Sequence, residues 1–213
     1  MNNSSILYEQ LSANLPKLHC WEGEYNHGGF DLGLMDKLHS FLQDAELSNG
    51  GKVFMETGAG LSTLLFLCCN PKSVVTCTLE DSEFINRLMS SVKDFNLPYE
   101  LLALHIGHSE KLLPKIVLDG DPYVDFFLID GGHGWPTVFV DFCYAYYSTK
   151  QYGYIVLDDT QLYSVGALSA FLKEQPGLEV ALDLGKTIIF KKIYIDRHLP
   201  DFGGQPYIKR QSF

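Results

Sequence analysis

The sequence predicts an α/β fold with a mostly parallel sheet that ends in an antiparallel hairpin. From about residue 50 onward, short apolar runs rich in β-branched residues alternate with helix-like stretches, which is typical of a parallel sheet covered on both faces. The last two apolar runs are separated by only three residues, 184–186, too few for a helical crossover. They are therefore expected to pair antiparallel.

The elements follow from these patterns in chain order. Residues 1–50 carry apolar positions at helical spacing, at Leu32, Met35, Leu38 and Leu42, and predict a leading helical segment rather than strands. Residues 51–195 are expected to form the α/β domain, and residues 196–213 an irregular tail. Seven strands are predicted, over residues 53–56, 73–80, 99–106, 125–130, 154–158, 179–183 and 187–192.

Composition narrows the class of partner. The formal net charge of -10 disfavours nucleic acid, whose binding depends on Lys and Arg that neutralise phosphates, and favours a small molecule. No apolar run approaches the ~20 residues of a membrane span, and the first residues lack the pattern of a signal peptide. Five cysteines without a paired C-x-x-C cluster indicate reduced thiols and a cytoplasmic protein, whereas association of identical chains stays open.

The most informative segment is 53–63, where an apolar strand runs into Glu56, Gly58 and Gly60 and then into Ser62 and Thr63. Such a turn lets backbone approach a ligand closely, and the following helix offers free N–H groups. A carboxylate directly before the turn suits a ligand with a positive charge and would repel a pyrophosphate. An ordinary strand-to-helix turn is the alternative.

A second acidic residue, Glu80, follows the next predicted strand, 24 residues after Glu56. This is near the distance at which nucleotide-binding folds place a carboxylate on ribose hydroxyls. A solvated strand end is the alternative. Together with the glycine-containing turn, Glu80 is interpreted as a ribose ligand.

These motifs resemble those of class I S-adenosylmethionine (SAM)-dependent methyltransferases. The chain is similar to methyltransferase family 24 and, more distantly, to the catechol and caffeoyl-CoA O-methyltransferases, over about residues 50–192. The resemblance rests on the E-x-G-x-G turn, Glu80, the run 129–133 and the strand 154–159, in family order. It implies a three-layer, Rossmann-like, seven-stranded methyltransferase fold. It also implies that Ser109 lies against the adenine, although Glu110 stands where the family carries Gln.

Three acids at two neighbouring strand ends, Asp130, Asp158 and Asp159, are candidates for a metal site. Hard cations such as Mg²⁺ take oxygen ligands, and adjacent strand ends can converge on one ion. The resemblance implies the same, since Asp130 and Asp158 match two acidic ligands of the metal-dependent enzymes, whereas Asp159 stands where Asn is usual. The alternative, that these acids cap the next helix or shape a pocket, stays open.

His133 lies where the metal-dependent relatives carry a lysine that removes the substrate proton. Histidine suits a general base because its unperturbed pKa of about 6.5 lies near operating pH. Trp135, in the same loop, either stacks on a flat substrate or packs beneath it.

The sequence therefore predicts a SAM-dependent methyltransferase that acts on an oxygen of a small molecule. A non-catalytic cofactor-binding protein of the same fold is one alternative, and a nucleotide-dependent oxidoreductase is another. We expect His133 and Asp130 to be catalytic, and a divalent cation to be held by Asp130, Asp158 and Asp159. The residues expected to bind the cofactor are Glu56, Gly58, Gly60, Ser62, Glu80, Ser109 and Asp130.

Overall fold

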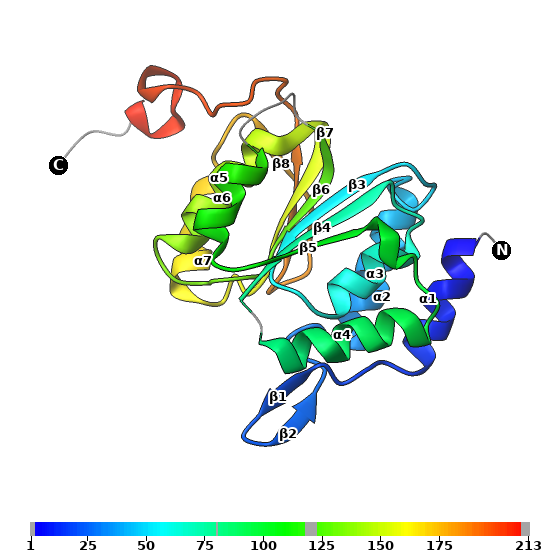
Figure 1. Cartoon of the computed structure of the whole chain (residues 1–213). Coiled ribbons are helices and arrows are strands. Elements are labelled where there is room, and N and C mark those ends of the chain that lie inside the picture. The colour runs from blue at the N-terminus through cyan, green and yellow to red at the C-terminus, as the bar shows by residue number, and fades with distance from the viewer. Residues whose placement is uncertain (1–2, 80, 118–122, 210–213) are drawn as a thin grey trace. The chain divides into compact units, whose positions relative to one another are not determined.

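The computed structural model describes residues 3–79, 81–117 and 123–209 (Figure 1). The chain divides into two compact units, Met1–His108 and Ser109–Phe213. Among the described residues, the main sheet has seven strands in the order β5-β4-β3-β6-β7-β9-β8. The predicted α/β class with a mostly parallel sheet and an antiparallel end is confirmed.

The first unit carries three parallel strands. Its elements are α1 (Asn3–Ala13), β1 (His19–Trp21), β2 (Glu24–Asn26), α2 (Leu32–Asp44), β3 (Val53–Thr57), α3 (Leu61–Cys68), β4 (Ser73–Thr78), α4 (Ser82–Asp94), η1 (Tyr99–Leu101) and β5 (Leu102–Ile106). Strand β4 pairs in parallel with β3 and with β5. All five residues of β3 are buried, as expected for a central strand that alternates little between apolar and polar residues.

Helices of the first unit pack through their apolar faces. Both α1 and α2 contact α3, an almost wholly apolar helix whose residues are all buried. Under α3, the rings of Phe54 and Phe66 stack with centroids 5.0 Å apart. Helix α4 begins at a side-chain cap, because Asp81 accepts a hydrogen bond from the backbone N–H of Phe84. The cap fixes where α4 starts, immediately after the end of β4.

The leading segment differs from the sequence-based expectation. Residues 1–50 do contain helices α1 and α2, but between them lies the antiparallel hairpin β1–β2, where helix rather than strand was predicted. Its turn residues Glu22 and Gly23 have φ of +51° and +84°. Two successive positive φ values match the twist of a two-residue hairpin loop, so the Glu-Gly dipeptide was the signal that the helical periodicity obscured.

The second unit carries the antiparallel end of the sheet. Its elements are α5 (Ser109–Val117), β6 (Val124–Ile129), α6 (Thr137–Ser148), β7 (Thr149–Leu157), α7 (Tyr163–Leu172), β8 (Leu178–Asp183), β9 (Ile188–Lys192), η2 (Phe202–Gly204) and η3 (Pro206–Lys209). Strands β6 and β7 are parallel, whereas β9 runs antiparallel to both β7 and β8. The predicted terminal hairpin is thus confirmed.

Helix α6 packs on β6 and β7 and is flanked by α5 and α7. Beyond β9, the described residues, up to 209, form the two short 3-10 turns η2 and η3. Within the described ranges, the helices are too short or too polar to span a membrane. The arrangement leaves the loops that follow β6 and β7 at the carboxyl ends of adjacent parallel strands, where open α/β sheets place ligands.

Candidate active site

In the first unit, the glycine turn comprises residues 58–60, between β3 and α3. Gly58 has a φ of +90°, a conformation that side-chain-bearing residues rarely adopt. Its N–H donates to the carbonyl of Cys77 on β4 at 2.9 Å. Gly60 immediately precedes α3 and donates its N–H to Oγ1 of Thr63 at 3.1 Å. The turn is therefore held by backbone and hydroxyl partners on two sides.

Glu56 organises the base of this turn. The side chain is fully buried, and its carboxylate accepts hydrogen bonds from the hydroxyls of Ser62 at 2.6 Å, Thr63 at 2.5 Å and Thr76 at 2.8 Å. Hydrogen bonds to a charged acceptor are stronger than neutral ones, which offsets part of the cost of burying the charge. The network ties β3, α3 and β4 together, so Glu56 fixes the shape of the turn. Its contact with a cationic ligand stays a prediction.

The other predicted cofactor residues lie at strand and helix ends. Ser62 is buried in the first turn of α3, and its hydroxyl is directed to Glu56. Ser109 is buried at the first position of α5, in the second unit. Glu80 lies outside the described residues.

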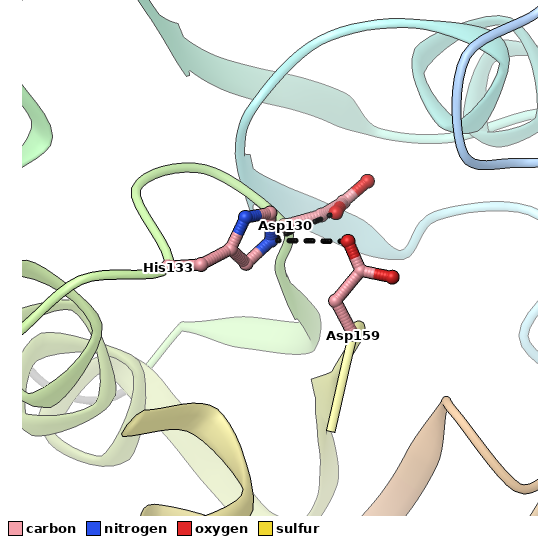
Figure 2. A group of neighbouring side chains, drawn as sticks. All are labelled: Asp130, His133 and Asp159. Carbon is pink, nitrogen blue, oxygen red and sulfur yellow. Dashed lines mark ion pairs between the residues drawn. The ribbon is translucent and has the colours of Figure 1, made fainter. Parts of the chain in front are cut away.

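In the second unit, Asp130, His133 and Asp159 form a strand-end cluster (Figure 2). Asp130 follows β6, His133 lies in the loop beyond it, and Asp159 comes after β7. Nε2 of His133 lies 3.4 Å from Oδ1 of Asp130 and 3.6 Å from Oδ2 of Asp159. One potential ligand atom from each residue lies within 4.8 Å of the others. The parallel pairing of β6 with β7 is what brings the two loops together.

Burial and opposite charge shift the ionisation of this cluster. Burial raises the pKa of Asp130 to about 6, although the neighbouring His133 acts in the opposite direction. Interaction with the Asp130 carboxylate raises the pKa of His133 above its ordinary value, against the effect of burial, and the charge of Asp159 adds to the rise. Both shifts come from contacts within the cluster, which places two coupled titratable groups side by side, as general acid–base chemistry needs.

Asp158 is not part of the cluster of ligand atoms. It is almost fully buried, and its Oδ2 accepts from Nζ of Lys186 at 2.8 Å while its Oδ1 accepts from the hydroxyl of Thr187. Lys186 also donates to Oδ1 of Asp159 at 3.1 Å. The structure thus brings together Asp130, His133 and Asp159, whereas both carboxylate oxygens of Asp158 are held by β8–β9 residues.

Lys186 and Thr187 were not identified from the sequence as site residues. They lie in the β8–β9 turn, which is tied to the loop after β7: the N–H of Thr160 donates to the carbonyl of Lys186 at 2.8 Å, and the Thr160 hydroxyl donates to the carbonyl of Gly185 at 3.0 Å. The sequence signal that could identify them is a lysine in a short predicted hairpin that follows an acidic strand end. These contacts hold a positive charge beside Asp158 and Asp159.

The loop that carries His133 is tied to α7, since the Ser164 hydroxyl donates to the carbonyl of His133. Large aromatic side chains stand exposed on both segments: Trp135 is 77% exposed and Tyr163 is 93% exposed. Because Trp135 is exposed, it does not pack beneath the loop. Stacking on a substrate stays a prediction.

No family model matches the chain, and no curated protein does either. Among solved structures, it is similar to the O-methyltransferase TomG from Streptomyces achromogenes in complex with SAM, with 15% identity, 91% of each chain covered and a TM-score of 0.64. It is also similar to an O-methyltransferase from Bacillus cereus in complex with S-adenosylhomocysteine (SAH), with 16% identity, 89% of this chain and 90% of that chain covered, and a TM-score of 0.61.

A third similar structure is the methyltransferase MycE of the mycinamycin biosynthetic pathway, in complex with Mg, SAH and mycinamycin VI. It shares 14% identity over 92% of this chain and 56% of MycE, with a TM-score of 0.58. These similarities confirm the predicted fold, that of class I SAM-dependent methyltransferases.

Proposed function

We propose that this chain is a SAM-dependent methyltransferase that methylates an oxygen of a small molecule. The observation that carries the proposal is the glycine turn after β3, in a sheet where β9 lies antiparallel between β7 and the last strand, β8. A dinucleotide dehydrogenase has the order 3-2-1-4-5-6 instead. SAM-bound and SAH-bound proteins of the same fold, such as TomG and the Bacillus cereus enzyme, support this choice of cofactor.

The cofactor is proposed to lie on the glycine turn. Gly58 has no side chain and a positive φ, and the Glu56 network keeps the turn in shape. The buried carboxylate below the turn places negative charge there, which suits a sulfonium and an ammonium group better than a pyrophosphate. Gly60, Ser62, Glu80, Ser109 and Asp130 complete the proposed set of cofactor-binding residues.

His133 is proposed to be the base that accepts the proton of the acceptor hydroxyl. Methyl transfer needs a deprotonating nucleophile aligned with the methyl group, so a base and correct positioning are what the protein must supply. Asp130 and Asp159 flank Nε2 of His133 and stabilise the protonated imidazole that forms. The exposed Trp135 is proposed to contact the acceptor.

A divalent cation is the second candidate for this site. Asp130 and Asp159, with His133, offer two oxygens and one nitrogen at ligand-like separations. When bound, a cation would polarise the acceptor oxygen. Asp158, however, is held by Lys186 and Thr187, so the set Asp130, Asp158 and Asp159 does not fit one ion in this arrangement. Because an imidazole that ligates a metal is not free to take a proton, the two roles of His133 exclude each other.

The partner and location follow from composition. A net charge of -10 supports a small-molecule acceptor rather than nucleic acid. The five cysteines are free thiols, as suits the reducing cytoplasm that we propose as the location.

The deciding experiment is methyl transfer from SAM labelled in its methyl group to a panel of hydroxylated small molecules, with and without a chelator. The proposal expects labelled product, and a base role for His133 expects it to persist in chelator. Activity that disappears with the chelator and returns with Mg²⁺ would assign the cluster to a metal instead. SAH binding without transfer to any acceptor would support the non-catalytic alternative.

A further inference from the structure

The imidazole of His19, on hairpin β1–β2, lies directly against the glycine turn. A Cβ added to Gly60 would lie 3.3 Å from Nε2 of His19, and one added to Gly28 would lie 2.5 Å from Cδ2 of the same ring. The ring thus fills the space beside two glycines, one of them the N-cap residue of α3. No motif in the sequence pointed to His19.

The hairpin is fixed in this position by α4. The rings of His19 and Phe84 lie with centroids 4.9 Å apart. Nε of Arg87 donates to the carbonyl of Leu18 at 2.8 Å, and the guanidinium lies 5.0 Å from the ring centroid of Tyr25. Contacts at both strands hold the hairpin next to α4, as Figure 1 shows. The position of His19 is therefore fixed by contacts within the first unit.

The imidazole also adds a polar group beside the turn. The N–H of Gly60 is already donated to Thr63, and the N–H of Gly58 to Cys77, so two backbone donors of the turn are used internally. The half-buried imidazole next to Gly60 brings an additional ring nitrogen to the same place. SAM carries ribose hydroxyls and an amino-acid carboxylate, which such a ring N–H can bind.

We propose that His19 is a cofactor-binding residue, donating a hydrogen bond from its imidazole to a polar group of SAM on the glycine turn. This inference rests on the proposed function. It makes hairpin β1–β2 a wall of the cofactor site, contributed by a segment that precedes the sheet.

The test is His19→Phe, which keeps an aromatic ring against Phe84 but removes the ring N–H. We expect the Kd for SAH, measured by calorimetry, to rise about 10-fold, the size expected for one lost hydrogen bond, with the thermal midpoint nearly unchanged. Cys20→Ala, at the exposed neighbouring position of β1, is the matched control and should bind SAH as the wild type does. In imidazole NMR spectra, the His19 signal, identified by its loss in His19→Phe, should shift when SAH is added.

Two results would overturn the inference. One is wild-type SAH affinity in His19→Phe with a stationary His19 signal; the other is an equal loss of affinity in Cys20→Ala, which would mean that the hairpin acts only by its integrity. Failure of the proposed function gives a different result, because wild-type protein would then bind no SAH at all.

Discussion

Glu56 and Asp158 are both buried carboxylates at the carboxyl ends of parallel strands, yet their surroundings differ. Glu56, on β3 of the first unit, accepts three hydroxyl donors. Asp158, after β7 of the second unit, accepts one hydroxyl and the ammonium group of Lys186, which also reaches Asp159. The first arrangement joins three elements by neutral donors, whereas the second holds positive charge beside a histidine whose pKa is raised.

This difference indicates that the two carboxylates have different roles, one in the shape of the backbone and one in the charge of a site. A carboxylate bonded to hydroxyls on β3, α3 and β4 sets a backbone shape, which is what a cofactor turn needs. Acids that share Lys186 and His133 set the charge at the site where we propose that a proton is transferred. We therefore expect changes at Glu56 to appear in stability and cofactor binding, and changes at His133 to appear in turnover.

The largest effect is expected at His133. His133→Ala should lower kcat by about 10²–10⁴-fold, the usual contribution of a general base, because the acceptor proton loses its destination. The Kd for SAH, measured by calorimetry, should stay within about 2-fold of the wild type, because the residue is assigned to the acceptor and not to the cofactor. Normal turnover in this variant would assign activation of the acceptor to another group.

Next in size is the loss of the Glu56 network. Glu56→Ala leaves the buried hydroxyls of Ser62, Thr63 and Thr76 without their shared acceptor, so the free energy of unfolding should fall by about 2–3 kcal/mol. Urea denaturation measures this. Glu83→Ala is the control, since its side chain is 80% exposed and pairs with Arg87 at 3.9 Å, and it should change stability by less than about 0.5 kcal/mol. Equal effects at the two positions would contradict a structural role for Glu56.

Replacement of Lys186 should lower the free energy of unfolding by less than replacement of Glu56 does. Lys186→Met deprives the buried Asp158 of its cation, but Lys186 itself is 32% exposed, so solvent screening reduces the loss of unfolding free energy to about 1–2 kcal/mol. The matched control is Lys173→Met, whose partner Asp183 is 47% exposed. A loss as small as that of the control would show that Asp158 does not depend on Lys186.

A pH-dependent effect is expected from Lys192, a fully buried lysine that donates to the carbonyls of Tyr146 at 2.8 Å and Thr149 at 3.0 Å. Burial, reinforced by the charge of Arg197, lowers the pKa of Lys192 to about 8. Between this value and the ordinary lysine pKa of about 10.4, the unfolded chain holds more protons than the folded chain, so the contribution of Lys192 to stability rises with pH.

The measurement is urea unfolding of the wild type and of Lys192→Met at several values between pH 8 and 10. The wild type should gain stability relative to the variant as pH rises. Lys191→Met controls for the loss of a positive charge on the same strand. A difference that stays flat or falls with pH would contradict the shift at Lys192.

Much of this arrangement could be predicted because it depends on local patterns. Apolar runs located the seven strands, and the short connection after residue 183 identified the antiparallel end. The position of Asp130, His133 and Asp159 at adjacent strand ends followed from parallel pairing.

The remaining features depend on contacts between residues far apart in the sequence. The sequence predicts Glu56 as a ligand, but it does not reveal the hydrogen bond from Thr76, which depends on the β3–β4 register. Likewise, Lys186 reaches Asp158 only because β9 pairs with β7. His19 is placed by a hairpin that docks on α4. Local periodicity carries no information on such pairings.

The central claim, that the glycine turn holds SAM, is tested most directly by calorimetric titration of SAH into the wild type, Gly58→Leu and Gly51→Leu. Both glycines have positive φ, +90° and +71°, so both variants carry similar backbone strain, but Gly51 lies at the opposite end of β3, where an added Cβ meets nothing within 4 Å. The account predicts SAH binding by the wild type and Gly51→Leu and an affinity loss of about 100-fold or more in Gly58→Leu. Equal SAH affinity in all three proteins, or binding of NAD in place of SAH by the wild type, would contradict it.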